Sequence, residues 1–430
     1  MRGMQQVVRQ AWWMFFGRYR LLAVFTLAFL SRLLAVALLH WLNDPSIQQG
    51  FFSSAGAEFS YMAAGLVSGR GLTLLYVHGQ YVPSAYQPPL YAWLLATLFA
   101  TLGHGQLAYV ALQTVQCLLG AWGSVGVYWV GREIFSAETA TLAAFLSAIY
   151  PPLVYVPAEV HPLGLTILVT LGFVLAALRL RRQPTPGLAI ALGCAGGVLV
   201  LLRSEAVLLN PMTILWSAWG RRRANWRYYA LAGLLAAMFL CPWLIRNRLV
   251  LGRWVLTTTT GYNLWRGQGV LATGSARDLQ GVAVGTTPEL ERQLNALPWS
   301  ADYELKSDAI LQAAAWDYIQ AHPWNWLRLT PAKLFFFWGV DLTHPRARNI
   351  LYWGPSLLAV GLAGIGWRAA RRRPLTDVLL IWPGVYTGLT LLFFALPRYR
   401  LYAEPFVLLL AAYGLTRLWE RRWASPRQAL

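Results

Sequence analysis

The chain has 430 residues, of which 57% are hydrophobic and 12% are charged. Average soluble domains have about 45–50% and about 25%, so this chain carries more apolar surface than one soluble core can bury. The formal net charge is +19, but the arginines stand in short clusters between apolar runs. That placement is typical of cytoplasmic membrane loops and argues against nucleic acid as a partner. The sequence therefore indicates the lipid bilayer as its solvent.

The N-terminal region combines arginines with a first apolar stretch, residues 21–42. The stretch exceeds the apolar region of a signal peptide, about 7–15 residues, and lacks a clear small-residue cleavage site. We interpret it as an uncleaved first span. Cys117, Cys194 and Cys241 all fall in apolar segments, where a free thiol behaves as a small hydrophobe. Neither a disulfide framework nor a cysteine-based metal site is expected.

Apolar segments recur along the rest of the chain, and a membrane-spanning helix needs about 20 mainly apolar residues. The expected spans are 21–42, 107–131, 137–156, 163–181, 187–202, 205–217, 227–247, 349–367, 376–395 and 401–418. Two shorter segments, 88–103 and 325–340, are interpreted as re-entrant or interfacial helices on the outer face. The sequence predicts an all-α polytopic membrane protein with about ten to twelve transmembrane helices.

Arginine-rich connections set the predicted orientation, because cytoplasmic loops carry an excess of Lys and Arg. The expected cytoplasmic clusters are Arg132, residues 179–182, 221–223 and 371–373, and Arg421 with Arg422. The outer side then receives a first loop, residues 43–87, and a long loop. This organisation divides the chain into an N-terminal transmembrane module (1–247), an outer cap (248–324) and a C-terminal transmembrane module (325–430).

Acidic residues near the outer ends of the apolar segments are scarce, and a carboxylate there is costly unless it is paired or functional. Glu58 lies in AGAEFSYMAAGLVSGRG, whose apolar spacing predicts an amphipathic helix on the outer surface. Glu159 follows three prolines that break an apolar run. The alternatives without a catalytic role are a solvated charge on the helix face for Glu58 and a stabilising charge at a helix N-terminus for Glu159. His161 beside Glu159 falls short of a metal site, so no metal is expected.

Basic residues on the predicted outer side form the complementary set, because guanidinium groups bind phosphate oxygens in bidentate fashion. They are Arg203, Arg246, Lys333, Arg398 and Arg400. Each has the alternative of being an interfacial residue whose charged end reaches toward water. The chain contains no Walker loop, no Rossmann glycine fingerprint, no HExxH and no GxSxG elbow. ATP-driven transport and serine hydrolysis lose their main support, and no cofactor is expected.

Several segments resemble, in order, the GT-C glycosyltransferases, which include the protein O-mannosyltransferases and the lipid A aminoarabinose transferase. They are EFSYMAAGLVSGRGL, PSAYQPPLYAWLLATLF, AIYPPLVYVPAEV, LLRSEAVLLNP, CPWLIRNRLVLGRWV with GYNLWRGQ, YIQAHPWNWLRLTPAKLFFFW, and ALPRYRLYAEPFVLLLAA. The resemblance implies a GT-C-like bundle and a polyprenyl-phosphate-linked sugar as donor. Such an enzyme needs a carboxylate to deprotonate the acceptor and cations to neutralise the departing phosphate.

Two positions depart from the pattern that the resemblance implies. The family places an Asp four residues before the aromatic residue that aligns with Phe59, and this chain has Ala55 there. The aminoarabinose-transferase branch has a Lys before the PPL triplet, where this chain has Gln87. The usual base is therefore missing, and either Glu58 or Glu159 has replaced it or the activity has been lost.

The sequence as a whole predicts an inverting glycosyltransferase of a bacterial-type inner membrane, acting at its outer face on a lipid, glycan or protein acceptor. Glu58 and Glu159 are the candidate bases, and the five cations above are the candidate donor phosphate ligands. The candidate sugar or acceptor contacts are Tyr61, Gln87, His161 and Trp265. The alternatives are a transporter or flippase for a polyprenyl-linked glycan, and a catalytically silent binding protein.

Overall fold

The computed structural model of the chain describes residues 2–43, 50–53, 56–75, 79–278, 280–344, 347 and 349–423, with side chains from residue 19 to 421. The first half contains α1 (Arg2–Trp41), α3 (Gly50–Ser53), α4 (Ala57–Val67), β1 (Thr73–Leu75), β2 (Tyr81–Pro83), α5 (Leu90–Leu102), α6 (Gln106–Ile134), α7 (Ala137–Ile149), α8 (Pro151–Tyr155), η2 (Val156–Ala158), α9 (Leu163–Arg182), α10 (Pro186–Leu202) and α11 (Ala206–Ala218). The second half contains η3 (Arg223–Asn225), α12 (Trp226–Leu251), α13 (Thr260–Gln268), α14 (Pro288–Asn295), α15 (Tyr303–Ala321), α16 (Pro323–Trp338), α17 (Ile350–Ala370), η5 (Thr376–Leu380), α18 (Ile381–Leu392), α19 (Pro397–Arg400) and α20 (Glu404–Trp423).

The predicted all-α fold class is confirmed, and each of the ten expected spans contains a helix. By length and composition, and within the described residues, five helices can cross a membrane, or six if the bent pair α7–α8 forms one span. The other expected spans are shorter, such as α10 and α11, or carry charges, such as α20. The count is therefore lower than ten because several apolar helices fall short of the roughly 20 residues that a span needs.

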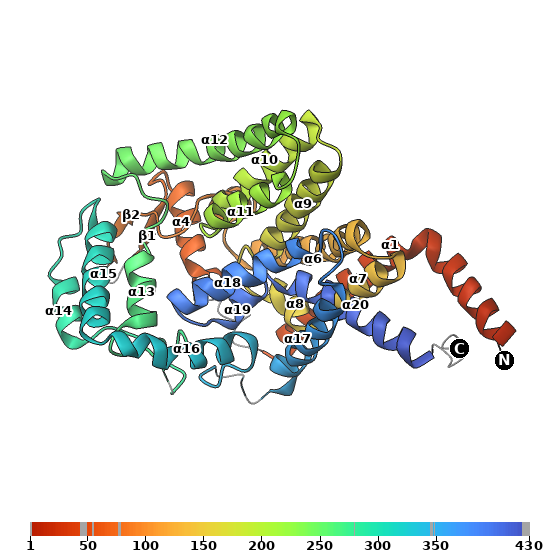
Figure 1. Cartoon of the computed structure of the whole chain (residues 1–430). Coiled ribbons are helices and arrows are strands. Elements are labelled where there is room, and N and C mark those ends of the chain that lie inside the picture. The colour runs from red at the N-terminus through yellow and green to blue at the C-terminus, as the bar shows by residue number, and fades with distance from the viewer. Residues whose placement is uncertain are drawn as a thin grey trace.

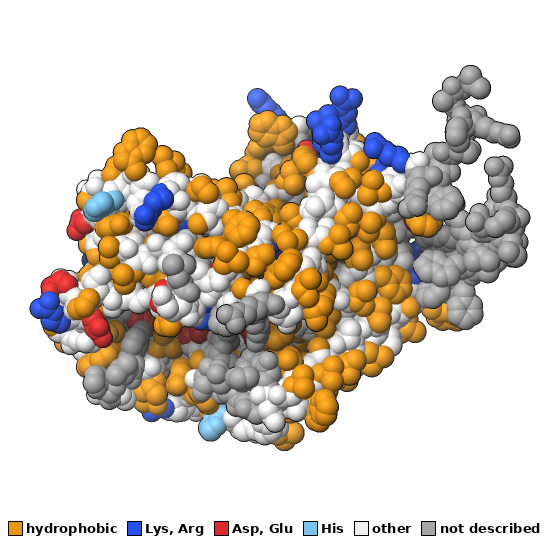
Figure 2. Space-filling model, turned by 90° about the horizontal axis from the view of Figure 1, so that it is seen from below, with side chains coloured by type: hydrophobic (Ala, Val, Ile, Leu, Met, Phe, Trp, Pro, Cys, Tyr) orange, Lys and Arg blue, Asp and Glu red, His pale blue; other side chains and the backbone are white. Residues whose placement is uncertain are grey.

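The long helices lie between two ends of the molecule (Figure 1). At one end lie α13, α14 and α15, and at the other lie both termini. Helix α6 packs against α1, α7 and α9, and α10 packs against α9 and α12. Figure 2 shows apolar side chains over much of one face and acidic side chains gathered at the end that carries α14 and α15. The surface thus has the apolar flank expected of a protein that contacts lipid.

Strands are few in this chain. In the described residues, β1 and β2 form one antiparallel pair in the predicted first outer loop, with Thr73 opposite Pro83 and Leu75 opposite Tyr81. The hairpin packs against α4. It fixes the path of the chain between α4, which carries Glu58, and α5, which Gln87 precedes.

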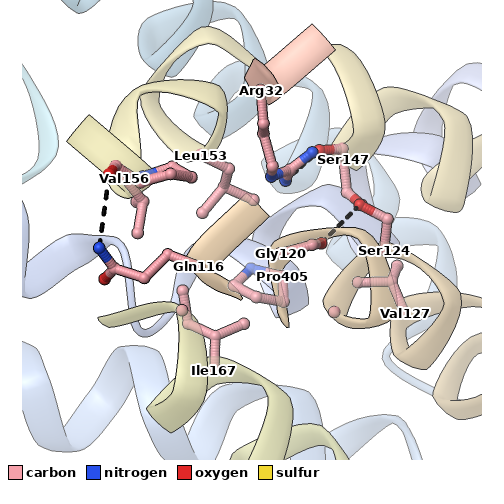
Figure 3. Close-up of a pocket in the computed structure, with 13 residues that line it drawn as sticks. Arg32, Gln116, Gly120, Ser124, Val127, Ser147, Leu153, Val156, Ile167 and Pro405 are labelled. Atoms are coloured by element: carbon pink, nitrogen blue, oxygen red, sulfur yellow. Dashed lines mark hydrogen bonds between the residues drawn. The ribbon is translucent and has the colours of Figure 1, made fainter. Parts of the chain in front are cut away.

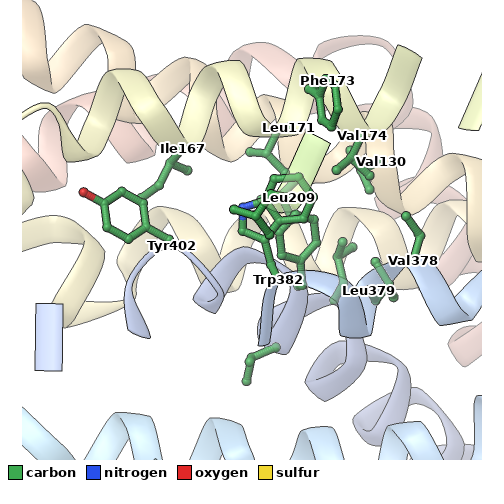
Figure 4. Close-up of a cluster of buried hydrophobic side chains, with 14 of the residues drawn as sticks. Val130, Ile167, Leu171, Phe173, Val174, Leu209, Val378, Leu379, Trp382 and Tyr402 are labelled. Carbon is green, nitrogen blue, oxygen red and sulfur yellow. The ribbon is translucent and has the colours of Figure 1, made fainter. Parts of the chain in front are cut away.

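A large buried cluster joins the N-terminal and C-terminal helices (Figure 4). The indole of Trp382, from α18, lies 6.1 Å from the ring of Phe173 in α9 and 5.4 Å from that of Phe406 in α20, measured between ring centroids. Because lipid is as apolar as these rings, close packing between the helices stabilises the cluster more than exclusion of water does. Helices from distant parts of the sequence therefore share one core.

Helices α17 and α20 approach each other closely through two glycines. A Cβ added to Gly366 would lie 1.9 Å from the carbonyl oxygen of Leu410, and one added to Gly414 would lie 2.4 Å from that of Leu362. Backbones come this close only where small residues face each other. The glycines therefore set the spacing of this helix pair.

We expect Gly366→Ala to destabilise the protein by about 1–3 kcal/mol, because the added methyl group forces α17 away from α20. Thermal unfolding of the detergent-solubilised protein measures the loss. Gly364→Ala is the matched control on the same helix, because a Cβ there meets open space. Equal melting temperatures for the two variants would contradict the assignment.

Candidate functional site

The chain bends sharply between α7 and α8, and the broken segment that follows, α8 with η2, leads to Glu159. Pro151, Pro152 and Pro157 lack amide hydrogens, so the helix cannot continue through them, and α7 and the α8–η2 segment meet at 51°. The Nε2 group of Gln116, on α6, donates to the Glu159 carbonyl oxygen at 2.9 Å. The break predicted from the prolines is present, and Gln116 of α6 binds the end of the broken segment at Glu159.

The first outer loop packs directly against this break. A Cβ on Gly56 would lie 1.9 Å from the carbonyl oxygen of Val160, and the ring of Phe59 lies 6.1 Å from that of His161. The predicted helix at Glu58 is present as α4, with Glu58 in its first turn, but it is packed inside the protein instead of lying on the surface: of its residues only Val67 is exposed. The amide of Gln87 donates to the Glu58 carboxylate at 3.3 Å. Both candidate bases therefore belong to one assembly of loop and broken span.

Two charged residues tie the first loop to the rest of the molecule. The buried Glu304 carboxylate, from α15, accepts from the amide of Ala85 at 3.0 Å and from the Thr258 hydroxyl at 2.5 Å. The Arg246 guanidinium, on α12, donates to the carbonyl oxygens of Ser84 at 2.7 Å and Leu72 at 3.0 Å. These contacts make Arg246 an anchor of the loop.

A second anchored segment brings two more arginines toward the break. The amide of Ala395 donates to the carbonyl oxygen of Gly274 at 2.9 Å, and the amide of Ala276 donates back to that of Ala395 at 3.2 Å. The Arg266 guanidinium donates to the Ala276 carbonyl oxygen at 2.5 Å. The loop after α13 is thereby fixed beside the start of α19.

These segments enclose a cavity of about 460 Å³. The charged side chains that line it are Glu159, Arg266, Arg277, Asp341, Arg398 and Arg400. Among the described residues, the Nε atoms of Arg266 and Arg398 are buried and have no hydrogen-bond partner. The cavity lining has four arginines and two carboxylates. The excess of positive charge attracts anions.

Electrostatic effects link Glu58 and His161 to the same region. Burial raises the pKa of the Tyr86 phenol well above its ordinary value, the Glu58 carboxylate adds to this rise, and Arg266 opposes it. Burial lowers the pKa of His161 well below its ordinary value, and Arg398 and Arg203 lower it further. His161 is therefore neutral near pH 7. It lies between the broken segment and the two arginines that act on it.

The five cations that the sequence analysis grouped together differ in whether they line the cavity. Arg398 and Arg400 line the cavity, whereas Arg203, Arg246 and Lys333 do not. Arg203 pairs with Glu205 at 2.5 Å. Lys333 is fully buried and donates to the Leu391 carbonyl oxygen at 3.0 Å.

Arg400 is also committed, because its guanidinium pairs with the buried Glu404 carboxylate at 2.8 Å and donates to the Phe337 carbonyl oxygen. Asp341 is held by the hydroxyl groups of Ser275 at 2.9 Å and Thr343 at 2.6 Å. Arg398 and Arg266 line the cavity, and each has a buried Nε atom without a hydrogen-bond partner among the described residues.

The candidate sugar contacts also occupy different surroundings. Gln87 and His161 lie in the loop and break described above. The Tyr61 hydroxyl donates to the Phe52 carbonyl oxygen at 3.4 Å, and the buried Trp265 indole donates to that of Gly285 at 3.0 Å. None of these four residues lines the 460 Å³ cavity, and neither does Glu58. Ala55, the position of the expected Asp, lies outside the described residues.

The sequence did not single out Arg266 and Arg277 as site residues. Arg266 lies in GYNLWRGQ, one of the segments of the family resemblance, so its position carried a signal. Arg277 lies in a Gly- and Thr-rich stretch without periodicity, and only the fold brings it to the cavity. Among the described residues no group of three or more His, Cys, Asp or Glu side chains is placed to hold a metal ion.

The fold is that of a helical polytopic membrane protein, and comparisons with known proteins relate it to the GT-C type. Residues 86–245 match the model of the dolichyl-phosphate-mannose-protein mannosyltransferase family. The predicted resemblance to GT-C glycosyltransferases is thereby confirmed. No curated protein sequence matches the chain at a significant level.

Solved structures share the fold. The oligosaccharyltransferase AglB from Archaeoglobus fulgidus, in complex with an inhibitory peptide and a dolichol-phosphate, superposes with a TM-score of 0.56 at 14% identity, over 96% of this chain and 53% of that chain. The same enzyme tethered to an acceptor peptide gives 0.55 at 13% identity, over 95% and 50%. This chain therefore spans about half the length of those structures. ArnT from Cupriavidus metallidurans bound to undecaprenyl phosphate gives 0.37 at 14% identity, over 84% and 72%, which is too low to place the chain in that branch.

The burial of Lys333 can be tested by the pH dependence of the folding stability. Burial lowers its pKa from the ordinary value to about 7. Below pH 7 the ammonium group is charged in the folded and unfolded chain, and the folded state carries the full burial penalty. Above pH 7 the unfolded chain keeps the proton that the folded chain has released, so folding stability rises with pH, by up to about 1.4 kcal/mol per unit.

We expect Lys333→Met to melt higher than the parent protein at pH 6, and this advantage to shrink toward pH 9. The Leu391 carbonyl oxygen keeps other donors in the variant, from Gln268 at 3.2 Å and Trp326 at 3.3 Å. Lys306→Met is the control, because Lys306 is partly exposed. A pH-independent difference for Lys333→Met would show that its ammonium group stays protonated in the fold.

Proposed function

We propose that the chain transfers a sugar from a polyprenyl-phosphate carrier to an acceptor, and that the 460 Å³ cavity is the site. The observation that carries the proposal is the combination in one cavity wall of the Glu159 carboxylate with Arg266 and Arg398, whose buried Nε atoms have no partner among the described residues. The family match at residues 86–245, which includes Glu159, supports it.

The proposed reaction needs both a carboxylate and the arginine guanidinium groups. A carboxylate, Glu159 or Glu58, takes the proton from an acceptor hydroxyl or amine, and the acceptor atom attacks the anomeric carbon. The bond from that carbon to the phosphate oxygen breaks, and the phosphate leaves with the electron pair. Arginine guanidinium groups stabilise the charge that grows on the phosphate. A single displacement inverts the anomeric configuration.

Glu159 is the first proposed base because it lines the cavity, and Glu58 is the second because its loop packs against the same break. Glu205 pairs with Arg203, and Glu404 pairs with Arg400. Asp341 accepts hydrogen bonds at both carboxylate oxygens. Glu159 lines the cavity, and Glu58 is held in place by Gln87. We assign the proton transfer to Glu159 first, and acceptor positioning to Glu58.

The proposed location is a bacterial-type inner membrane, with the cavity opening toward the outer side. The arginine-rich helix ends support this orientation. Arg179 and Arg182 at the end of α9 pair with Glu133 at the end of α6, at 3.0 and 2.7 Å, and these ends lie away from α13, α14 and α15 (Figure 1). The carrier lipid would enter from the bilayer and the acceptor from the outer side.

We expect Glu159→Gln to lower the rate of sugar transfer by about 10²–10⁴, the usual cost of losing a general base. Transfer of radiolabelled sugar from a polyprenyl-phosphate donor to extracted acceptors measures it, with Glu58→Gln tested in parallel. The exposed Glu291→Gln is the control and should keep the parent rate. If Glu159→Gln and Glu58→Gln both fold and keep full rates, the mechanism is wrong.

We expect Arg398→Gln to weaken binding of polyprenyl phosphate about tenfold to a hundredfold, because a hydrogen bond to a charged group contributes about 1.5–3 kcal/mol. Titration of the lipid phosphate against the purified protein measures this, and Arg266→Gln should behave alike. The exposed Arg253→Gln is the control. Unchanged affinity in both cavity variants would remove the phosphate assignment. Binding without transfer in the parent protein would instead indicate a silent binding protein.

A further inference from the structure

Arg32 is a charged residue in the middle of an apolar span. It stands in the segment Tyr19–Trp41 of α1, nine residues or about 14 Å before the end of the helix, and is 2% exposed. None of the ion pairs in the described part of the chain includes it. An ionisable group inside a span is costly and marks a specific task.

The partners of Arg32 are backbone carbonyl oxygens at the break between α7 and α8. Its guanidinium donates to Ala148 at 3.2 Å and to Ser147 at 3.3 Å, as well as to Ala28 of its own helix at 2.9 Å. The neighbouring Ser31 hydroxyl donates to the Ala148 carbonyl oxygen at 2.7 Å. Figure 3 shows Arg32 beside Ser147, with Gln116 on the opposite side of a small cavity.

These two carbonyl groups are the ones that the prolines leave without donors. In a continuous α-helix the carbonyl of Ser147 would accept from residue 151 and that of Ala148 from residue 152. Both positions are proline and have no amide hydrogen. The side chains of α1 therefore occupy the places of the two missing amide groups.

The fit of Arg32 against α6 is close. A Cβ on Gly120 would lie 2.4 Å from Arg32 Nε and 2.8 Å from Cδ. The small cavity beside the guanidinium measures about 20 Å³ and is lined on its other side by Leu153, Val156 and Pro157. Val156 also lines the 460 Å³ cavity that contains Glu159. One short segment thus separates Arg32 from the candidate site.

We propose that Arg32 is a positioning residue, which with Ser31 replaces the donors that Pro151 and Pro152 lack and so fixes the break that carries Glu159 into the cavity. The part of this proposal that concerns Glu159 rests on the proposed function. Arg32 itself does not line the 460 Å³ cavity and touches neither the donor nor the acceptor.

A thermodynamic cycle tests the capping role without any activity assay. Arg32→Met is expected to lower the Tm of the solubilised protein by several degrees. In a Pro151→Ala/Pro152→Ala background the same substitution should lower the Tm much less, because the alanine amides supply the missing donors. An equal loss in both backgrounds would overturn the proposal, since the guanidinium would then stabilise the fold in some other way.

Transfer kinetics test the positioning role. Arg32→Met should lower kcat about tenfold to a hundredfold, because a displacement of about 1 Å at a reacting group has that effect, while KM for the lipid-linked donor stays unchanged. Arg32→Lys should recover part of the rate, because its ammonium group can still donate to a freed carbonyl. A parental kcat in Arg32→Met would refute positioning.

Gly120→Ala gives an independent variant, because its methyl group displaces the guanidinium without removing it. We expect the same fall in kcat, and no change for Gly172→Ala on α9, where a Cβ meets open space. Parental kinetics for Gly120→Ala would count against the proposal. If the parent protein transfers no sugar, the proposed function fails, and the melting cycle still decides whether Arg32 replaces the proline donors.

Discussion

Backbone carbonyl groups freed at helix breaks must be satisfied from within an apolar protein, because lipid offers no hydrogen bonds. Several buried or partly buried cations of the chain donate to such carbonyl groups at helix ends, breaks and turns. The contacts are Arg32 with Ser147 and Ala148, Arg246 with Ser84 and Leu72, Lys333 with Leu391, Arg400 with Phe337, and Arg181 with Trp216 and Trp219. Each joins a helix to a break or turn elsewhere in the sequence. The breaks, and the site built on them, depend on these side chains.

The same constraint separates two kinds of cation near the candidate site. Arg246 and Lys333 donate to carbonyl oxygens outside the cavity, so their charges hold the chain together. Arg398 and Arg266 line the cavity and keep buried donor atoms that have no partner among the described residues. A phosphate group offers the acceptors that such donors lack. The phosphate assignment therefore rests on the four arginines that line the cavity, two of which have a buried Nε atom without a partner among the described residues.

The sequence predicted the features that depend on short stretches of chain. Apolar runs predicted the helices, three prolines predicted the break before Glu159, and apolar spacing predicted a helix at Glu58, though not its burial. The sequence could not predict which cations share a cavity, because this depends on which freed carbonyl each one meets in the fold. Arg277 reaches the cavity only through the pairing of residues 274–276 with Ala395.

The walls of the cavity are anchored by contacts that lie outside it. Arg32 and Gln116 hold the break, and the buried Arg400–Glu404 pair holds the segment after α19. Breaking such a buried pair is costly, because the remaining charge is left without compensation. Donor groups fixed in this way need no rearrangement when charge develops on a leaving phosphate, which is the condition for strong electrostatic stabilisation. In the proposed mechanism, the structural cations therefore contribute by holding the segments that form the cavity wall, while Arg266 and Arg398 meet the phosphate.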